Sequence, residues 1–254
     1  MNKQNDFFPD ELAFGEEIKK VFGENGLSEY LNERTLPLFY RFTYILWQTN
    51  KSLNLTALTD AHDMTVKHLA DSLLVAPYFS EGASVIDVGC GGGFPTFPLA
   101  IARPDLKITA LDSTEKKVNF VRTTARELGF DNITAVCGRA EELASGDMRE
   151  SFDFATARAV AALPVLAELC LPFVRVGGSF VAMKSMRIDE ELAAARAKNI
   201  FAVLGGEREP RVDLPELVDG DERLSRSIAT ARKISATPPK YPRPYAQILK
   251  NNKK

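Results

Sequence analysis

Residues 85–95 read VIDVGCGGGFP, and this stretch decides the fold. Val85 to Val88 is typical of a buried strand, and it runs directly into a turn with glycine at positions 89, 91 and 93. Glycine is needed where a chain turns with positive φ, or where backbone must lie against a ligand with no Cβ between them. A strand, a glycine turn and a helix start together form a nucleotide-type pocket at the carboxyl end of a parallel strand.

The spacing of these glycines distinguishes between nucleotide cofactors. A dinucleotide-binding turn has the pattern G-x-G-x-x-G, but Phe94 stands where the third glycine is required. The pattern here is D-x-G-x-G-x-G, which resembles the loop of S-adenosylmethionine-dependent methyltransferases. The carboxylate of Asp87 suits a cofactor with cationic ammonium and sulfonium groups, whereas it would repel a pyrophosphate. The alternative is a glycine-rich turn in an unrelated α/β protein.

A second acid ends the next expected strand. Asp112 follows an apolar run and lies 25 residues after Asp87. In nucleoside-binding α/β folds, an acid about 20 residues on accepts both ribose hydroxyls. Asp112 could instead cap the following helix, but the spacing favours the ribose role. The segment 138–141 follows the third expected strand, where the base of a nucleoside would lie.

Composition excludes several classes of protein. The chain has 254 residues, of which 45% are hydrophobic, enough for a sizeable core. No apolar run approaches the ~20 residues of a membrane span, and the first residues lack the apolar stretch of a signal peptide. The three scattered cysteines fit a reducing cytoplasm. Two histidines leave little for a metal site or a catalytic triad, and the lack of sustained heptads favours a monomer.

The order of the expected elements predicts the architecture. Apolar residues at helical spacing predict an N-terminal helical extension, with helices at 11–21, 29–48 and 64–75. From residue 84 strands alternate with helices, which indicates a mostly parallel sheet covered on both faces. Strands are expected at 84–88, 107–111, 132–136, 152–157 and 178–183, with helices at 95–103, 114–128, 162–170 and 188–198. A final antiparallel strand pair is expected at 200–206 and 226–234.

The charge is distributed unevenly along the chain. From Arg223 to Lys254 there are nine basic residues and no acidic one, which leaves 23 basic against 34 acidic residues elsewhere. A basic segment on an acidic body indicates a polyanionic partner met on one face. Tyr241 and Tyr245 lie among these charges, as on a surface that stacks bases. The alternative is a solvated tail, although four prolines between residues 238 and 244 stiffen it.

Several motifs together resemble the RsmG (GidB) family of 16S ribosomal RNA methyltransferases. They are HLADSL (68–73), DVGCGGGFP (87–95), LDS (111–113) with Lys116, Lys117 and Phe120, RAE (139–141), FD (152–153) with Arg158-Ala159, Met183-Lys184, and the tail KISATPPKYPR (233–243). The resemblance covers about residues 50–245. It implies a Rossmann-like class I methyltransferase with a seven-stranded, mostly parallel sheet. The expected parts are a helical extension (1–80), the methyltransferase domain (81–235) and a basic tail (236–254).

The resemblance also implies the reaction and the site. S-adenosylmethionine would donate a methyl group to N7 of one guanosine in 16S ribosomal RNA, with naked RNA or the small ribosomal subunit as partner. The expected cofactor-binding residues are Asp87, Gly89, Gly91, Gly93, Phe94, Asp112, Ala140, Glu141 and Arg158. Arg158 would also position the reactants, and RNA contacts are expected from Lys184, Arg223, Lys240 and Arg243. No metal ligand is expected. The chain departs from the family pattern at Cys90, Thr96, Phe97 and Ser185.

Several roles remain open at this point. Guanine N7 carries a lone pair and no proton, so alignment alone can supply catalysis and no base is needed. Arg158 could contact RNA or form a structural ion pair. Lys184 could contact RNA, or its aliphatic chain could be buried against apolar surface. His68, Asp71 and Ser72 could brace their helix against the cofactor loop or contact substrate. The alternative functions are methylation of another substrate and a noncatalytic role as an RNA-binding assembly factor.

Overall fold

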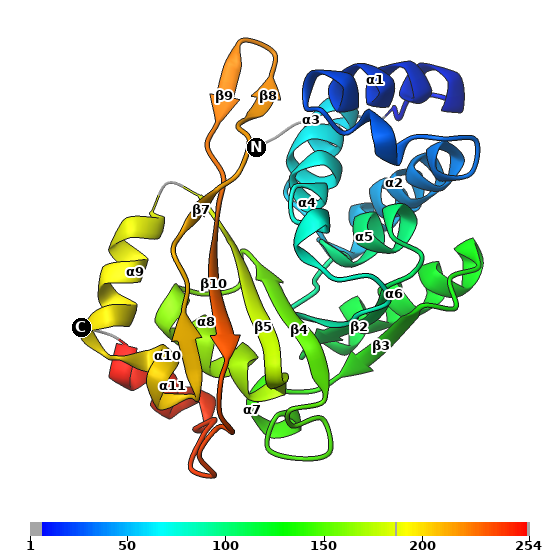
Figure 1. Cartoon of the computed structure of the whole chain (residues 1–254). Coiled ribbons are helices and arrows are strands. Elements are labelled where there is room, and N and C mark those ends of the chain that lie inside the picture. Colours follow the sequence, from blue (N-terminus) through cyan, green and yellow to red (C-terminus); the bar gives the residue numbers. More distant parts are fainter. Residues whose placement is uncertain (1–6, 186, 253–254) are drawn as a thin grey trace.

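A computed structural model describes residues 7–185 and 187–252 of the chain. Figure 1 shows a helical N-terminal region beside a central sheet that carries further helices on its other face. The N-terminal helical elements are α1 (Glu11–Glu24), η1 (Ser28–Tyr30), α2 (Thr35–Leu53), α3 (Ala61–Met64), η2 (Thr65–Ala70), α4 (Asp71–Leu73) and η3 (Ala76–Tyr78). The later ones are α5 (Thr96–Ala102), α6 (Glu115–Leu128), α7 (Ala140–Leu143), α8 (Leu163–Cys170), η4 (Leu171–Phe173), α9 (Ile188–Ala197), α10 (Ile200–Val203) and α11 (Tyr245–Asn252).

The central sheet confirms the expected α/β class. Its strands are β1 (Ser84–Val88), β2 (Lys107–Asp112), β3 (Ile133–Cys137), β4 (Phe152–Arg158), β5 (Val174–Lys184), β6 (Gly206–Arg208), β7 (Val212–Asp213) and β10 (Ser227–Lys233). The order is β3-β2-β1-β4-β5-β10-β6, and β7 also pairs with β10. Strands β1 to β5 are parallel, and β10 runs antiparallel to β5. The sheet is mostly parallel, as expected, but it has eight strands where seven were expected, because the two-residue strand β7 left no pattern in the sequence.

Alternation along the strands divides the core between the two faces of the sheet. Val85 of β1 packs with α2, α5 and the other N-terminal helices, whereas its neighbour Ile86 packs with α8 and α9. This is the period of two expected for a strand that is buried on both faces. The sheet therefore presents only its strand ends to a ligand, and the strand order reverses between β1 and β4, where ligands bind in open α/β sheets.

The structure corrects two expected elements. The helix expected at 29–48 begins at Thr35, because the side chain of Asn32 accepts hydrogen bonds from the backbone N–H groups of Arg34 and Thr35 and ends the preceding turn. The strand expected at 200–206 is helix α10 followed by β6. A short apolar run such as Ile200–Val203 does not distinguish a strand from a buried helical turn by its periodicity.

Two further features complete the fold. The segments β8 (Leu217–Asp219) and β9 (Glu222–Leu224) form a separate hairpin that the sequence patterns did not indicate. It extends beyond the sheet near α3 (Figure 1), where Asp219 pairs with His62 and Lys67. Within the described ranges, every helix is too short or too polar to cross a bilayer.

Candidate functional site

The glycine turn between β1 and α5 is shaped by its backbone. Gly89, Gly91 and Gly93 have φ values of 80°, 55° and 88°. The N–H of Gly89 donates to the carbonyl of Leu111 at 2.7 Å, which ties the turn to the end of β2. A Cβ at residue 89 would lie 2.6 Å from the side chain of Val160. Position 89 therefore requires glycine for both its dihedral angle and its space.

Asp87 is buried beneath this turn. Its Oδ2 accepts a hydrogen bond of 2.6 Å from the hydroxyl of Thr96, while its Oδ1 has no partner among the described residues. Burial raises the pKa of Asp87 to about 7, and the hydrogen bond from Thr96 and the charge of Arg158 oppose that rise. An unpaired buried carboxylate oxygen is costly unless a ligand completes its hydrogen bonding. Asp87 thus fits a cationic group placed at the glycine turn.

The carboxylate of Asp112 accepts hydrogen bonds from two backbone N–H groups. Its Oδ1 accepts from the N–H of Thr114 at 2.8 Å, at the start of α6, and its Oδ2 accepts from the N–H of Gly91 at 3.1 Å. Each carboxylate oxygen retains a second lone pair, so the hydroxyls of a ribose can still bind. These two hydrogen bonds hold the carboxylate at the end of β2, whereas the N-cap of α6 is Thr114 and not Asp112.

The first of two cavities at the strand ends lies beside Asp112. It has a volume of about 320 Å³. Its lining includes Gly89, Asp112, Thr114, Lys117, Arg139, Ala140, Glu141, Val160, Leu169 and Tyr245. Four expected cofactor-binding residues line it directly, namely Gly89, Asp112, Ala140 and Glu141. Asp87, Gly91, Gly93 and Phe94 do not line it but shape or support the turn. We call it the cofactor cavity. Arg158, the ninth expected residue, lines the second cavity instead.

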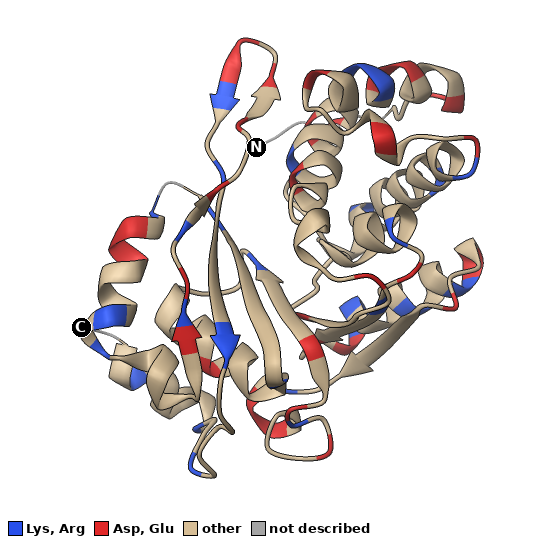
Figure 2. Cartoon of the chain, in the orientation of Figure 1, with Lys and Arg blue, Asp and Glu red and all other residues tan. Residues whose placement is uncertain are grey.

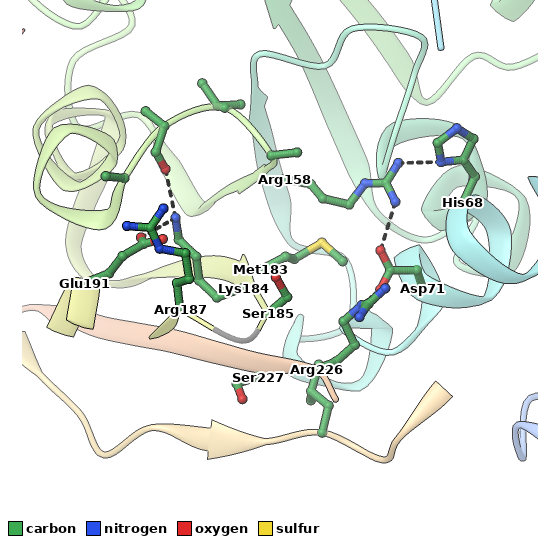
Figure 3. A pocket seen from close by; sticks show the side chains of 15 residues that line it. His68, Asp71, Arg158, Met183, Lys184, Ser185, Arg187, Glu191, Arg226 and Ser227 are labelled. Carbon is green, nitrogen blue, oxygen red and sulfur yellow. Dashed lines mark hydrogen bonds and ion pairs between the residues drawn. The ribbon is translucent and has the colours of Figure 1, made fainter. Parts of the chain in front are cut away.

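A second cavity of about 640 Å³ opens at the ends of β4 and β5 (Figure 3). It is lined by His68, Asp71, Arg158, Ala159, Val160, Met183, Lys184, Ser185, Arg187, Glu191, Leu214, Arg226 and Ser227, among others. We call it the acceptor cavity. Ala159 and Val160 line both cavities and thus form the wall between them. Ala159 has a φ of 56°, which turns the chain sharply after β4 and places Val160 against Gly89.

Arg158 is held inside the acceptor cavity by three partners. Its Nη1 donates to the carbonyl of Lys67 at 2.8 Å and to Oδ2 of Asp71 at 2.9 Å, and its Nη2 donates to Nδ1 of His68 at 3.1 Å. The other oxygen of Asp71 accepts from Nε of Arg226 at 2.5 Å. One buried carboxylate therefore joins two guanidinium groups, and the cluster has a net charge of about +1.

His68 is neutral and has a defined tautomer. Burial, together with the positive charge of Arg158, lowers its pKa to about 3. Nδ1 lies 3.1 Å from the Arg158 guanidinium, which can only donate, and 3.2 Å from the Lys67 carbonyl, which already accepts from Arg158. Nδ1 is therefore the acceptor, and Nε2–H donates to the hydroxyl of Thr56 at 2.6 Å.

Two expectations about neighbouring residues need correction. Phe94 does not line the cofactor cavity, because it is 6% exposed and its ring stacks on His68 with centroids 4.2 Å apart. The hydrogen bonds of His68 and Asp71 brace Arg158 and not the glycine turn, which His68 reaches only through this stacking. Ser72 is fully buried, and its hydroxyl has no partner among the described residues.

The basic residues expected to contact RNA fall into two groups. Lys184 donates to the carbonyl of Ala161 at 2.8 Å and pairs with Glu191 at 2.7 Å. Arg243 pairs with Glu168 at 2.6 Å, and that carboxylate is fully buried. Arg223 and Lys240, in contrast, are exposed. On the β8–β9 hairpin, Arg223 is the one basic residue and stands next to Asp219, Asp221 and Glu222 (Figure 2).

Sequence reasoning missed two residues of the site. Arg226 was counted only as one charge of the basic segment, and Tyr245 was expected on a surface that stacks the bases of a polyanionic partner. The structure places Arg226 in the acceptor cavity and Tyr245 in the cofactor cavity. The basic character of the segment was visible, but its return to the strand ends depends on contacts far apart along the chain.

Comparison with known proteins shows the family to which the chain belongs. The family model for rRNA small subunit methyltransferase G (GidB) matches residues 35–209. The ribosomal RNA small subunit methyltransferase G of Pelotomaculum thermopropionicum is 42% identical over 234 residues, which cover 91% of this chain and 95% of that protein. This chain belongs to the rRNA small subunit methyltransferase G family. The family's protein from Leuconostoc citreum is 43% identical over 218 residues, 84% of this chain and 89% of its own.

A solved structure agrees at the level of the fold. The [4+2]-cyclase SpnF superposes with a TM-score of 0.51 at 18% identity, over 66% of this chain and 82% of that one. The family membership confirms the resemblance predicted from the motifs, and the superposition supports the predicted Rossmann-like architecture. The glycine turn, Asp112 and Arg158 all lie within the residues that the family model matches.

Proposed function

We propose that this protein transfers the methyl group of S-adenosylmethionine to N7 of one guanosine in 16S ribosomal RNA. The observation that carries the proposal is the meeting of two cavities at the wall formed by Ala159 and Val160. The cofactor cavity contains the turn and the acid that suit a nucleoside, and the acceptor cavity contains a cationic cluster that suits a polyanion. Membership of the family supports rRNA as the substrate class.

The residues of the cofactor cavity fit the proposed methyl donor. Asp112 would bind the ribose hydroxyls, and Ala140 and Glu141 would flank the adenine. The unpaired Oδ1 of Asp87 would accept a hydrogen bond from the ammonium group, either directly or through water. When bound, S-adenosylmethionine supplies an electrophilic methyl group on a sulfonium. Gly91 and Gly93 give the turn its path, and Gly89 leaves room beside Val160.

The side chains around the acceptor cavity suit a reaction that needs no base. His68 is neutral, but its Nδ1 accepts from Arg158 and its Nε2–H donates to Thr56. Asp71 is held by two guanidinium groups, so it does not remove a proton. Arg158 retains unused N–H donors on Nε and Nη2 with which to orient the base. Catalysis would then come from alignment, with Arg158 as the main positioning residue.

The exposed cations extend the proposed RNA contact. Arg223 and Lys240 are exposed and would reach phosphates without opening an ion pair, although Arg223 also donates to the carbonyls of Gly220 and Glu222. Lys184 and Arg243 would serve RNA binding only if their ion pairs with Glu191 and Glu168 opened. The small ribosomal subunit, or its RNA before assembly, is the proposed partner, which places the protein in the cytoplasm.

Modification mapping tests the proposed function. We expect 16S ribosomal RNA from cells that lack this protein to lose one 7-methylguanosine, as seen by mass spectrometry of nuclease fragments. The purified protein with S-adenosylmethionine should restore that methyl group. An unaltered modification map, together with methylation of a different substrate, would favour the alternative methyltransferase. Failure of the protein to bind S-adenosylhomocysteine would favour a noncatalytic assembly factor.

A further inference from the structure

The C-terminal segment does more than extend from the body as a basic tail. Helix α11 packs against α8, and the ring of Tyr245, its first residue, lines the cofactor cavity. Tyr245 lies outside the range 35–209 that the family model matches. The segment expected to contact RNA therefore contributes a wall to the site expected for the methyl donor.

Contacts on both sides hold Tyr245 in this place. Before it, the backbone N–H and the guanidinium of Arg243 both bind the carboxylate of Glu168, at 2.9 Å and 2.6 Å. Glu168 is fully buried on α8, so this attachment is firm. After it, Ile248 is fully buried in the core beside α8. The guanidinium of Arg149 also donates to the carbonyl of Tyr241 at 2.9 Å.

The neighbours of Tyr245 place it at one particular end of the cofactor cavity. The guanidinium carbon of Arg139 lies 4.5 Å from the centroid of its ring. Arg139 in turn pairs with Glu141 at 3.1 Å, just after β3. The wall formed by Ala159 and Val160, where the two cavities meet, lies at the ends of β1 and β4 instead. Because β2 separates β3 from β1 in the sheet, Tyr245 stands at the end remote from the acceptor cavity.

The chemistry of that end favours a flat apolar group. Leu169 of α8 lines the same cavity as Tyr245, so an aliphatic and an aromatic side chain are both available to a planar ligand. Aromatic rings bind nucleobases by stacking, whichever base is present. We propose that Tyr245 recognises the adenine of the methyl donor, so that the C-terminal segment is part of the donor site. This inference rests on the proposed function, because it takes the donor to be S-adenosylmethionine.

Calorimetric titration with S-adenosylhomocysteine tests the inference on the full-length protein. We expect Tyr245→Ala and Tyr245→Leu to weaken binding about fivefold or more, since stacking on a base is worth ~1–3 kcal/mol. Tyr245→Phe keeps the ring and should bind within about twofold of the natural protein. Gln247→Ala changes an exposed residue of the same helix and should leave the affinity unchanged. Methylthioadenosine lacks the amino acid half of the ligand. Tyr245→Ala and Tyr245→Leu should weaken its binding by the same factor as they weaken that of S-adenosylhomocysteine.

The outcomes separate this inference from the proposed function. If the natural protein binds S-adenosylhomocysteine and Tyr245→Ala and Tyr245→Leu bind it equally well, the inference is wrong and the proposed function stands. If those variants instead lose affinity for 16S ribosomal RNA alone, Tyr245 belongs to the RNA surface, and the inference again fails. If the natural protein binds no donor analogue, the proposed function itself falls. Tyr245→Leu preserves apolar volume, so it keeps the test open should the alanine variant not fold.

Discussion

The guanidinium of Arg158 and the carboxylate of Asp71 form an ion pair of 2.9 Å that joins the end of β4 to the start of α4. The side chains of the two residues are 14% and 9% exposed, so the pair is largely shielded from water. Asp71 also binds Arg226, just before β10, at 2.5 Å. Three segments that are distant in the chain are thus locked together by one carboxylate in the acceptor cavity.

We expect Asp71→Asn to lower both stability and turnover. The change leaves two buried guanidinium groups short of a counter-charge, which typically costs about 3–5 kcal/mol of the free energy of unfolding. Asp71 lines only the acceptor cavity, so affinity for S-adenosylhomocysteine should stay the same while kcat falls. Urea unfolding, calorimetry and methyl transfer measure the three quantities. Glu190→Gln breaks an exposed ion pair with Arg187 and should change stability by less than ~1 kcal/mol. Equal effects of the two variants would contradict the buried role of Asp71.

From the lowered pKa of His68 we expect the stability of the protein to depend on pH. Its pKa is about 3 in the folded protein and near 6.5 in the unfolded chain, so the unfolded state binds more protons between these values. The free energy of unfolding should therefore fall as the pH drops below about 6.5. Where His68 takes up a full proton on unfolding, the fall is ~1.4 kcal/mol for each pH unit. His68→Gln keeps a hydrogen-bonding side chain without a titrating group. Urea unfolding at pH 7.5 and 5.5 should show a smaller acid loss in the variant, and an equal loss would show that other groups cause it.

From the raised pKa of Asp87 we expect affinity for the methyl donor to depend on pH between about 6 and 7. Burial raises its pKa to about 7, so without a ligand the group is largely protonated at pH 6. A cationic ligand favours the carboxylate form, so binding of S-adenosylmethionine should release a proton and become tighter as the pH rises to about 7. Calorimetry in buffers of different ionisation enthalpy measures that proton. Asp87→Asn should bind more weakly and without this pH dependence, whereas a persistent dependence would assign the proton to another group.

Local patterns predicted the frame of the site correctly. The strand that ends at Val88, the glycine turn and the acid at the end of β2 follow from residues close together in sequence, and the structure places them as expected. Hydrophobic periodicity and residue spacing are enough to predict these elements, because each one is built from residues that are neighbours in the chain. The apolar run Ile200–Val203 shows the limit of that method, since its state depends on what packs against it.

The partners of the charged residues could not be predicted in the same way. Arg158 and Asp71 are 87 residues apart, and Arg226 is a further 68 beyond Arg158. The sequence contained their charges, but only the folded sheet brings those charges into one cavity. The same reason explains why Lys184 and Arg243 were expected to face RNA. Their acidic partners, Glu191 and Glu168, were not recognisable as partners from spacing.

Arg243 and Arg223 offer a matched comparison between a structural cation and an exposed one. Arg243→Ala leaves the fully buried carboxylate of Glu168 unpaired, and we expect a loss of about 3–5 kcal/mol in the free energy of unfolding. The variant should also bind S-adenosylhomocysteine more weakly, because only the backbone N–H of residue 243 would still tie the segment that carries Tyr245 to Glu168. Arg223→Ala should leave stability unchanged within about 0.5 kcal/mol.

The dependence of RNA affinity on salt then distinguishes the two roles. Each phosphate contact removed from a single-stranded region lowers the slope of log affinity against log salt by ~0.7. Arg223→Ala should show such a decrease in filter binding to 16S ribosomal RNA, whereas Glu168→Gln combined with Arg243→Ala should not. If that double variant folds and its salt slope falls as far as that of Arg223→Ala, Arg243 leaves its carboxylate for RNA. The ion pair would then be a resting state that RNA binding opens, and the C-terminal segment would connect the RNA surface to the donor cavity.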